Sequence, residues 1–358
     1  MAAMSTCTPT RGADAGPPAG LAPAHEGALA RPGMVTLRAP GRLHLGFLDP
    51  AATLGRAFGS IGLVIDGFET AVAVSAARAD DVVAGTPAAQ AELERAARHL
   101  AALRRHSGRT DPLRLQLLDV LPAHAGFGSG TQLALAVGRA FAHWHGLAVD
   151  TPTLAHWLGR GLRSGVGIAG FDQGGLLVDG GPGPDGRPAP LLARLPLPAA
   201  WRVLVAQDDT LHGLSGQREK QAIATLAPLP QALAADICHQ VLMRVLPGAA
   251  TADMAGFAAG INRVQQVLGE HFAPAQGGCY TSPAVGRLME GLLRLAPGAV
   301  AVGQSSWGPT GFAIVASAAQ ADALATAAAA AGLLPPGLRL RSVAARAHGA
   351  TLADTRGR

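Results

Sequence analysis

The stretch 121–132, which reads LPAHAGFGSGTQ, decides the fold of this 358-residue chain. Apolar residues follow it at helical spacing, at Leu133, Ala136, Val137, Ala140, Phe141 and Trp144. They share one face of a helix, so three alternating glycines stand directly before a packed helix start. The first N–H groups of a helix lack partners within it and bind phosphate well. The candidate phosphate-binding residues are therefore Gly126, Gly128, Ser129, Gly130 and Thr131, although a tight turn with Thr131 as N-cap explains the same glycines.

Two familiar nucleotide-binding motifs do not fit the chain. A Walker loop needs a lysine directly after its last glycine, and the only lysine is Lys220. The segment 165–170 matches G-x-G-x-x-G, but it follows a predicted helix where a dinucleotide site requires a strand. Phosphate binding at 126–131 therefore calls for another fold.

The composition excludes several classes of protein. Hydrophobic residues make up 49% and charged residues 15%, so the chain folds over most of its length. The three cysteines lie far apart and form no C-x-x-C pair, which favours a reducing cytoplasm without disulfides. The net charge is +5, and nearly all basic residues are arginine. Without a basic run or a long apolar stretch, we expect small anionic substrates and neither nucleic acid nor a membrane.

The order of predicted elements indicates an α+β protein. Residues 1–33 have the composition of a disordered extension. A glycine and proline cluster near 180–190 divides the rest into domains 34–190 and 191–358. The predicted strands are 34–38, 61–65, 70–76, 113–118 and 201–206, and the predicted helices are 89–106, 131–145, 153–163, 216–226, 231–245, 251–268 and 283–294. The chain then ends with strand, glycine loop, strand, helix and strand.

Three segments in this order resemble the motifs of the GHMP kinase superfamily. They are APGRLHLGF at 39–47, the glycine loop at 122–132 and GQSSWGPTG at 303–311. The resemblance spans about residues 34–345. It implies a GHMP kinase-like fold, with an N-terminal domain similar to the second domain of ribosomal protein S5 and a ferredoxin-like C-terminal domain. The site would lie in the cleft between them.

The chain departs from the kinase motifs at several positions, and these departures narrow the set of GHMP families that it resembles. Gly130 replaces a kinase-loop serine, and the opening motif reads RLHLGFLD where kinases have R-x-N-L-x-G-E-H. These segments, with 171–181 and 213–216, resemble the β-ribofuranosylaminobenzene 5′-phosphate synthases. The resemblance implies that 4-aminobenzoate, or a close analogue, condenses with phosphoribosyl pyrophosphate and releases carbon dioxide and pyrophosphate in tetrahydromethanopterin biosynthesis. It also implies Mg²⁺ without an organic cofactor, and it is compatible with a homodimer. The alternatives are an ATP-dependent small-molecule kinase and a non-catalytic metabolite sensor.

Three residues are the catalytic candidates. Arg42 lies beside the end of the first strand, where its guanidinium can bind phosphate or a carboxylate. His44 shares a face with Arg42 if the strand continues, and it would orient substrate or move a proton. Asp172 lies in a glycine-dense region and is the candidate Mg²⁺ ligand. The competing interpretations are a solvated arginine, a structural histidine and a turn-capping aspartate.

The candidate substrate-binding residues come from three other places. They are Gln173, Arg218, Ser305, Ser306, Trp307 and Thr310. The last four belong to the C-terminal glycine loop, where an indole can stack on a flat ring beside hydroxyl donors. The histidines show no metal-ligand spacing, so zinc is not expected.

Overall fold

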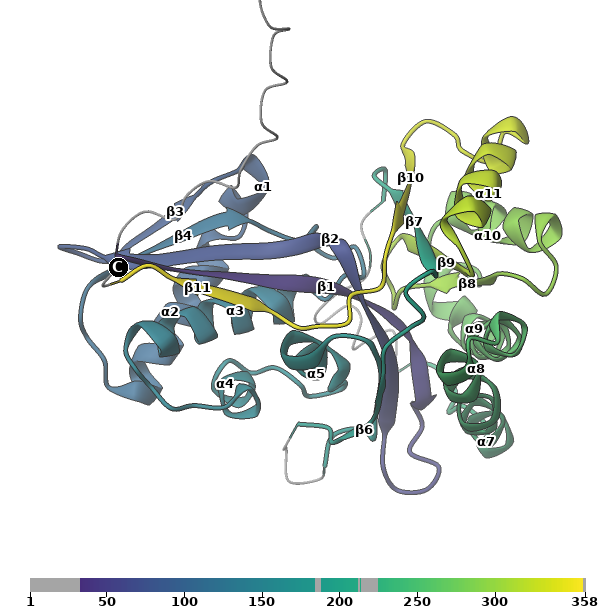
Figure 1. Ribbon diagram of the computed structural model, residues 1–358. Coiled ribbons are helices and arrows are strands. Elements are labelled where there is room, and N and C mark those ends of the chain that lie inside the picture. Colours follow the sequence, from purple (N-terminus) through teal and green to yellow (C-terminus); the bar gives the residue numbers. More distant parts are fainter. Residues whose placement is uncertain (1–32, 184–187, 212, 214–224, 357–358) are drawn as a thin grey trace, which may run out of the picture.

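The computed structural model describes residues 33–183, 188–211, 213 and 225–356. The predicted extension 1–33 lies outside these residues except for Gly33. Two separate sheets, each packed against helices, form the described part of the chain (Figure 1), which confirms the α+β class. Within that part, no helix is long and apolar enough to span a membrane.

The first sheet is built on two long antiparallel strands. Its order is β11 (Thr351–Asp354), β1 (Met34–Asp49), β2 (Phe58–Ala76), β4 (Leu113–Asp119) and β3 (Asp81–Ala84), while β5 (Leu176–Asp179) pairs with β2, and β6 (Leu191–Leu195) with β5. The strand predicted to end at 38 continues through Pro40 and Gly41, because a register shift between Pro40 and Arg42 absorbs them. The strands predicted at 61–65 and 70–76 are parts of β2.

Helices cover one face of this sheet (Figure 1). They are α1 (Pro87–Gln90), α2 (Leu93–Ser107), α3 (Ser129–Trp144), α4 (Thr151–Trp157) and α5 (Val166–Gln173). The predicted apolar stripe of α3 is buried against β1 and β2, with Leu133, Val137 and Phe141 almost fully shielded from water. Burying such side chains stabilises the fold by about 1.5–3 kcal/mol each. The glycine loop is therefore held by a fixed helix.

The second sheet has the predicted ferredoxin-like topology. Its order is β10 (Leu338–Val343), β7 (Arg202–Asp208), β9 (Thr310–Val315) and β8 (Ala301–Gln304). Along the chain these strands alternate with helices as strand, helices, strand, strand, helix, strand, which is the ferredoxin-like pattern. The helices α10 (Pro283–Leu295) and α11 (Ala318–Ala330) cover the sheet, and their core contacts include Leu288 and Leu324.

A third group of helices packs where the two sheets meet. It consists of α7 (Gln231–Gln240), the π-helix η1 (Val241–Val245), α8 (Leu246–Thr251) and α9 (Met254–Gln276). Its core joins Leu43 and Leu63 of the first sheet to Val203 and Phe312 of the second, with Ile261 of α9 between them. The two sheets therefore share one hydrophobic core.

The predicted domain boundary at 190/191 does not coincide with the division between the sheets. Strand β6 begins at Leu191 yet pairs with β5, and β11 returns from the far end of the chain to pair with β1. The correction has a physical reason. A strand edge is stabilised by whichever strand reaches it, whatever its distance along the chain.

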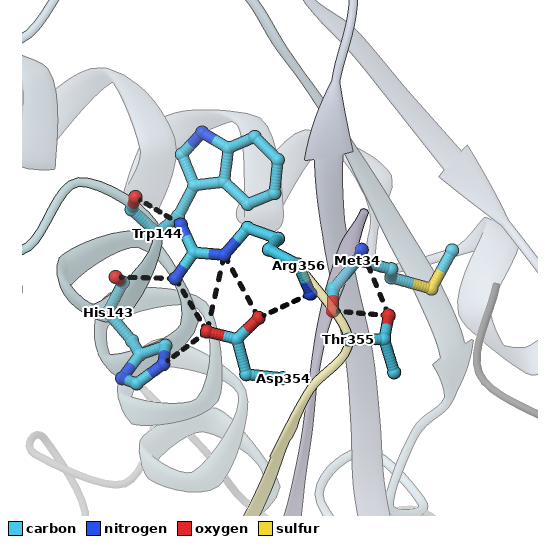
Figure 2. A network of polar contacts seen from close by, with 6 residues as sticks. All are labelled: Met34, His143, Trp144, Asp354, Thr355 and Arg356. Atoms are coloured by element: carbon cyan, nitrogen blue, oxygen red, sulfur yellow. Dashed lines mark hydrogen bonds and ion pairs between the residues drawn. The ribbon is translucent and has the colours of Figure 1, made fainter. Parts of the chain in front are cut away.

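Strand β11 is fixed by a polar network at its end (Figure 2). The Arg356 guanidinium donates to Asp354 and to the Trp144 carbonyl at 2.7 Å each, and its Cζ lies 4.9 Å from the centroid of the Trp144 ring. His143 also contacts Asp354, with 2.9 Å between Nε2 and Oδ2. Hydrogen bonds from Arg356 hold the pKa of Asp354 far below its ordinary value. The last strand is thereby tied to the end of α3.

Candidate active site

The glycine loop forms a cradle of backbone amides at the start of α3. Gly126 and Gly128 have φ angles of 95° and 74°, a left-handed conformation that strains other residues. Between them the buried Phe127 stacks on Phe68, with ring centroids 4.5 Å apart. The Gly128 carbonyl accepts from two amides of the first turn, but within the described part of the chain no acceptor takes the amides of Ser129 and Gly130. These two donors, at the positive end of the helix dipole, suit an anion.

Two arginines approach this cradle from different elements. Arg42 on β1 donates from Nη1 to the Gly126 carbonyl at 3.1 Å, and its guanidinium lies directly against Gly128. Arg160, which follows α4, lies beside Gly130. Burial, followed by the nearby Arg95, lowers the pKa of Arg160, although an arginine stays charged at neutral pH. The pair adds two planar cations that match phosphate geometry.

Together these residues line a hollow of about 160 Å³, called the phosphate hollow below. Its lining consists of Arg42, His124, Gly126, Gly128, Ser129, Gly130, Thr131, Arg160, Ser306, Trp307 and Gly308. No carboxylate belongs to this set, so the charge that faces the hollow from the described residues is positive. The hollow therefore favours an anionic group.

The hairpin loop between β8 and β9 forms the opposite wall. Gly308 packs so closely on the glycine loop that a Cβ there would lie 2.5 Å from the Ala125 carbonyl carbon. The Ser306 amide donates to the His44 carbonyl at 3.2 Å. Ser306 itself has a φ of 54°, a conformation that is uncommon for residues other than glycine and that often marks a functional site. The loop thus joins the glycine loop to β1.

A second hollow, called the aromatic hollow below, opens on the other side of this loop. It is lined by His44, Gly46, Phe47, Gln265, Leu268, Gly269, Phe272, Gln276, Cys279, Gln304, Ser306 and Trp307. Three aromatic rings, a leucine and three amide side chains make it suitable for a flat ring with polar ends. Its free space is about 30 Å³, roughly one water molecule, so a benzoate ring requires side chains near the exposed Cys279 to move.

Buried amides shape the wall of the aromatic hollow. Gln265 donates to the Leu45 carbonyl at 2.6 Å and accepts from the Gln304 amide at 2.8 Å. The Gln304 side chain in turn donates to the Ser306 carbonyl at 2.7 Å. These bonds link α9, β1 and β8 at one point, so the wall is rigid on the side of the hairpin loop.

Comparisons with known proteins agree with this geometry. Residues 91–176 match the GHMP kinase N-terminal domain, and residues 247–333 match the GHMP kinase C-terminal domain. The chain is 37% identical to the β-ribofuranosylphenol 5′-phosphate synthase of Archaeoglobus fulgidus over 294 residues, covering 78% of this chain and 88% of that protein. The enzyme of the same name from Methanothermobacter thermautotrophicus is 30% identical, with the same coverage. This chain belongs to the β-ribofuranosylphenol 5′-phosphate synthase family.

Solved structures of other GHMP proteins share the fold of this synthase family member. The homoserine kinase of Cytophaga hutchinsonii covers 92% of the chain, and all of that kinase is covered, with 15% identity and a TM-score of 0.65. The mevalonate diphosphate decarboxylase of Enterococcus faecalis covers 90%, and 99% of it is covered, with 18% identity and a TM-score of 0.61. At these identities the likeness concerns the fold alone. The predicted GHMP kinase-like fold is confirmed.

The structure of this synthase family member brings most of the predicted site residues together. All five glycine-loop residues, with Arg42, Ser306 and Trp307, line the phosphate hollow. His44 lines the aromatic hollow, which meets the phosphate hollow at Ser306 and Trp307. No register shift separates Arg42 from His44 on β1, so the two share a face of the strand as predicted.

Two residues of the C-terminal loop lie outside both hollows. Ser305 is completely buried, and its hydroxyl bonds the protein itself: it donates to the Gly126 carbonyl at 2.7 Å and accepts from the His44 amide at 2.9 Å. Thr310 is also completely buried, at the start of β9. Both hydroxyls therefore lie in the protein interior, and their predicted contact with substrate stays a prediction.

Asp172 and Gln173 line a separate hollow of about 750 Å³ beside α4. The Thr151 hydroxyl donates to Asp172 at 2.6 Å, and burial raises the pKa of this carboxyl group. Neither residue lines the phosphate hollow, and their roles in catalysis, Mg²⁺ binding and substrate binding stay predictions. Gly167, near the start of α5, is the residue that contacts Thr131 of the glycine loop. Asp172 follows five residues later, about 7.5 Å further along the helix and on another face.

Other positions were missed by sequence reasoning or lie outside the structure. Arg160 and His124 also line the phosphate hollow. Arg160 belongs to no motif, and His124 lies in the glycine-loop stretch but was not singled out as a ligand. Gln265 and Phe272 reach the aromatic hollow from α9, where the apolar period predicts only a helix. The predicted substrate residue Arg218 lies outside the described residues.

The described residues do not fit a magnesium ion held by the protein at this site. No carboxylate lines either hollow, and the described part of the chain contains no cluster of three or more histidine, cysteine, aspartate or glutamate residues suited to a metal. Mg²⁺ prefers carboxylate and phosphate oxygens. Asp172, the predicted ligand, faces another hollow.

Proposed function

We propose that this protein joins C1 of phosphoribosyl pyrophosphate to the ring carbon of a 4-substituted benzoate that carries the carboxylate. Carbon dioxide and pyrophosphate leave. The relatives are named for a phenol that carries ribose 5′-phosphate. Such a product forms from 4-hydroxybenzoate, whereas the 4-aminobenzoate expected from the sequence gives the aminobenzene analogue. We therefore take 4-hydroxybenzoate as the first acceptor to test, in a reaction of tetrahydromethanopterin synthesis.

One observation carries this proposal: two hollows of opposite chemistry meet at Ser306 and Trp307. The phosphate hollow offers fixed amides and two arginines, and the aromatic hollow offers flat apolar walls. A sugar diphosphate and a benzoate bound in this way bring C1 and the aromatic ring to the junction. Holding two reactants at contact distance removes much of the entropic barrier to their reaction.

Negative charge grows on the diphosphate as its bond to C1 breaks. The amides of Ser129 and Gly130, with Arg42 and Arg160, already point to the place where this charge develops. Because they are held by α3 and β1, they need little reorganisation during the step, which is the main source of electrostatic catalysis. The sugar is left with an electron-poor C1.

The aromatic hollow keeps water from that electron-poor carbon. Phe47, Phe272 and Trp307 are each at least nine-tenths buried and enclose the hollow with apolar surface. The ring carbon attacks C1, and the electron pair of its bond to the carboxylate then returns to the ring. Carbon dioxide leaves and aromaticity is restored. A dry site also protects C1 from hydrolysis.

We propose that any Mg²⁺ enters with the diphosphate and is held by substrate oxygens, as is common for phosphate substrates. A homodimer and a cytoplasmic location stay predictions from the sequence. The absence of a carboxylate beside the glycine loop among the described residues favours synthase over kinase chemistry, because a kinase commonly uses one to hold Mg²⁺ or to accept the proton of the alcohol.

The test uses purified protein with phosphoribosyl pyrophosphate and carboxyl-labelled 4-hydroxybenzoate. We expect equal amounts of labelled carbon dioxide and pyrophosphate, and a product with the mass of a ribosylated phenol phosphate. A parallel reaction holds 4-aminobenzoate. ATP-dependent phosphorylation of an alcohol without this product would support a kinase, and tight binding without any product would support a sensor.

A further inference from the structure

His44 is held in a fixed position, and the role inferred for it here rests on the proposed function. It lies on β1 with only 3% of its surface exposed. Its amide donates to the Ser305 hydroxyl at 2.9 Å, and its carbonyl accepts from the Ser306 amide at 3.2 Å. The ring packs edge-on against Phe47, with centroids 4.6 Å apart. The backbone and the ring of His44 therefore have one fixed position in the wall of the aromatic hollow.

One nitrogen of this ring lacks a partner. Among the described residues nothing bonds His44 Nε2, although it is fully buried. Leaving a buried polar atom unpaired destabilises the folded protein, and such atoms are rare in native proteins. Because the ring lines the aromatic hollow, a ligand bound there is in a position to supply the missing partner.

The ring is a neutral hydrogen-bond acceptor at Nε2. Burial, followed by the positive charges of Arg42 and Arg163, lowers the pKa of His44 well below its ordinary value. Nε2 has no partner among the described residues, and the closeness of the ring to its own backbone favours the proton on Nδ1. Neutral imidazole has one donor and one acceptor, which leaves a lone pair on Nε2.

This lone pair selects the chemistry of its partner. It repels a carboxylate, which also offers only lone pairs, and it binds a group with a hydrogen to donate. A 4-substituted benzoate has such a group at the end of the ring opposite the carboxylate. We propose that His44 Nε2 accepts a hydrogen bond, and then the proton, from the 4-hydroxyl group of the aromatic acceptor.

The proton transfer makes the ring a better nucleophile. When the ring carbon bonds to C1, the aromatic ring becomes electron-poor and draws electrons from the 4-oxygen. The O–H group then releases its proton to Nε2. The ring becomes a neutral dienone that still carries the carboxylate. Loss of carbon dioxide returns the electron pair of the C–C bond to the ring as a phenolate, which takes the proton back from His44. Protons and electrons balance without another reactant.

Two variants test this role by changing what the side chain offers near the position of Nε2. His44→Phe keeps the ring and removes the acceptor, whereas His44→Gln places an amide oxygen near the same point but cannot take up a proton. We expect His44→Phe to lower kcat with 4-hydroxybenzoate about 100-fold or more, as for other general bases. His44→Gln should retain binding but not turnover. Neither should change the KM for phosphoribosyl pyrophosphate by more than about threefold.

A binding measurement separates this role from a structural one. By calorimetry we expect wild type to bind 4-hydroxybenzoate about tenfold tighter than 4-methoxybenzoate, which has no proton to donate, as one hydrogen bond implies. In His44→Phe this preference should vanish, while in His44→Gln it should persist. His239→Gln, at an exposed histidine on α7, is the matched control and should behave as wild type.

Each outcome counts for or against the role of His44. The role would be overturned if His44→Phe kept the wild-type preference for 4-hydroxybenzoate over 4-methoxybenzoate. Turnover by His44→Phe within threefold of wild type would also overturn it. If wild type makes no product yet prefers the hydroxyl through His44, the acceptor site stands and the synthase function fails. If no benzoate binds, both fail. If His44→Phe does not fold, His44→Gln tests the role alone. Retained binding without turnover would support it, and turnover within threefold of wild type would overturn it.

Discussion

The hydroxyl of Ser305 donates a hydrogen bond to the carbonyl oxygen of Gly126 at 2.7 Å, although the two residues are 179 positions apart. The same hydroxyl accepts from the amide of His44 at 2.9 Å. One buried side chain therefore connects the glycine loop, the hairpin of the second sheet and strand β1. The three motifs that make up the site are held in place by the fold's own hydrogen bonds.

Replacing Ser305 should loosen this connection. Ser305→Ala leaves the Gly126 carbonyl and the His44 amide with one partner fewer, so we expect about 1–3 kcal/mol less stability in urea unfolding. Thr326→Ala, on the exposed face of α11, removes a hydroxyl that bonds only within its helix, and it should cost almost nothing. Equal midpoints for Ser305→Ala and wild type would contradict the role.

The left-handed glycine beside Arg42, which precedes α3, has a matched control just beyond the other end of that helix. Gly128→Ala and Gly146→Ala both place a Cβ on left-handed backbone, and each should cost roughly 1–2 kcal/mol of stability. Only at Gly128 does the new Cβ press on the Arg42 guanidinium, at 3.1 Å, whereas nothing lies within 4 Å at Gly146. We expect Gly128→Ala alone to raise the KM for phosphoribosyl pyrophosphate. Similar kinetics in both variants would remove the glycine loop from the site.

Arg160 should bind phosphate despite its absence from any motif. Arg160→Met removes one of two cations from the phosphate hollow, and losing a charge-assisted contact of about 2 kcal/mol weakens binding about 30-fold. Affinity for phosphoribosyl pyrophosphate should also depend less on salt. Arg78→Met, at an exposed arginine, serves as the control and should leave both values unchanged. Unaltered affinity in Arg160→Met would show that the diphosphate binds elsewhere.

Acid should destabilise the protein through His99. Burial, followed by the positive charges of Arg160, Arg95 and Arg98, lowers the pKa of His99 from 6.5 to about 4. Between these values the unfolded chain binds a proton that the folded chain refuses, so stability falls as pH decreases from about 7 to about 4. At pH 5 the unmet protonation of this histidine lowers the free energy of unfolding by about 2 kcal/mol.

The measurement is urea unfolding at pH 7 and pH 5. His99→Gln should lose about 2 kcal/mol less than wild type between the two conditions, since glutamine does not titrate. The stability that His99→Gln still loses between pH 7 and pH 5 comes from other titrating groups, among them the buried His44. An identical pH dependence in His99→Gln and wild type would show that His99 is not shielded from water.

Local signals in the sequence predicted the glycine loop and its helix well. The alternating glycines and the stripe from Leu133 to Trp144 follow each other directly within residues 126–144, and the structure places α3 at Ser129–Trp144. The face shared by Arg42 and His44 follows equally from strand alternation. Such features depend on neighbours along the chain, so periodicity detects them.

The positions of Arg160, Asp172 and Ser305 depend on contacts between residues far apart in the chain, which the sequence alone did not show. Arg160 reaches the glycine loop only because α4 and α5 fold beneath α3. Asp172 looked functional among glycines, yet the length of α5 carries it to another hollow. Ser305 looked like a ligand donor, and only the approach of Gly126 turns its hydroxyl to a structural use. No spacing along a single chain encodes these approaches.

The return of β11 to the edge of β1 affects biosynthesis. A ribosome that has produced both sheets up to Val343 still leaves this edge of β1 without its partner, because Thr351–Asp354 follows the other described strands along the chain. A bare strand edge pairs readily with other chains. Translation that stops early at this point should therefore yield polypeptides that aggregate through the open edge of β1.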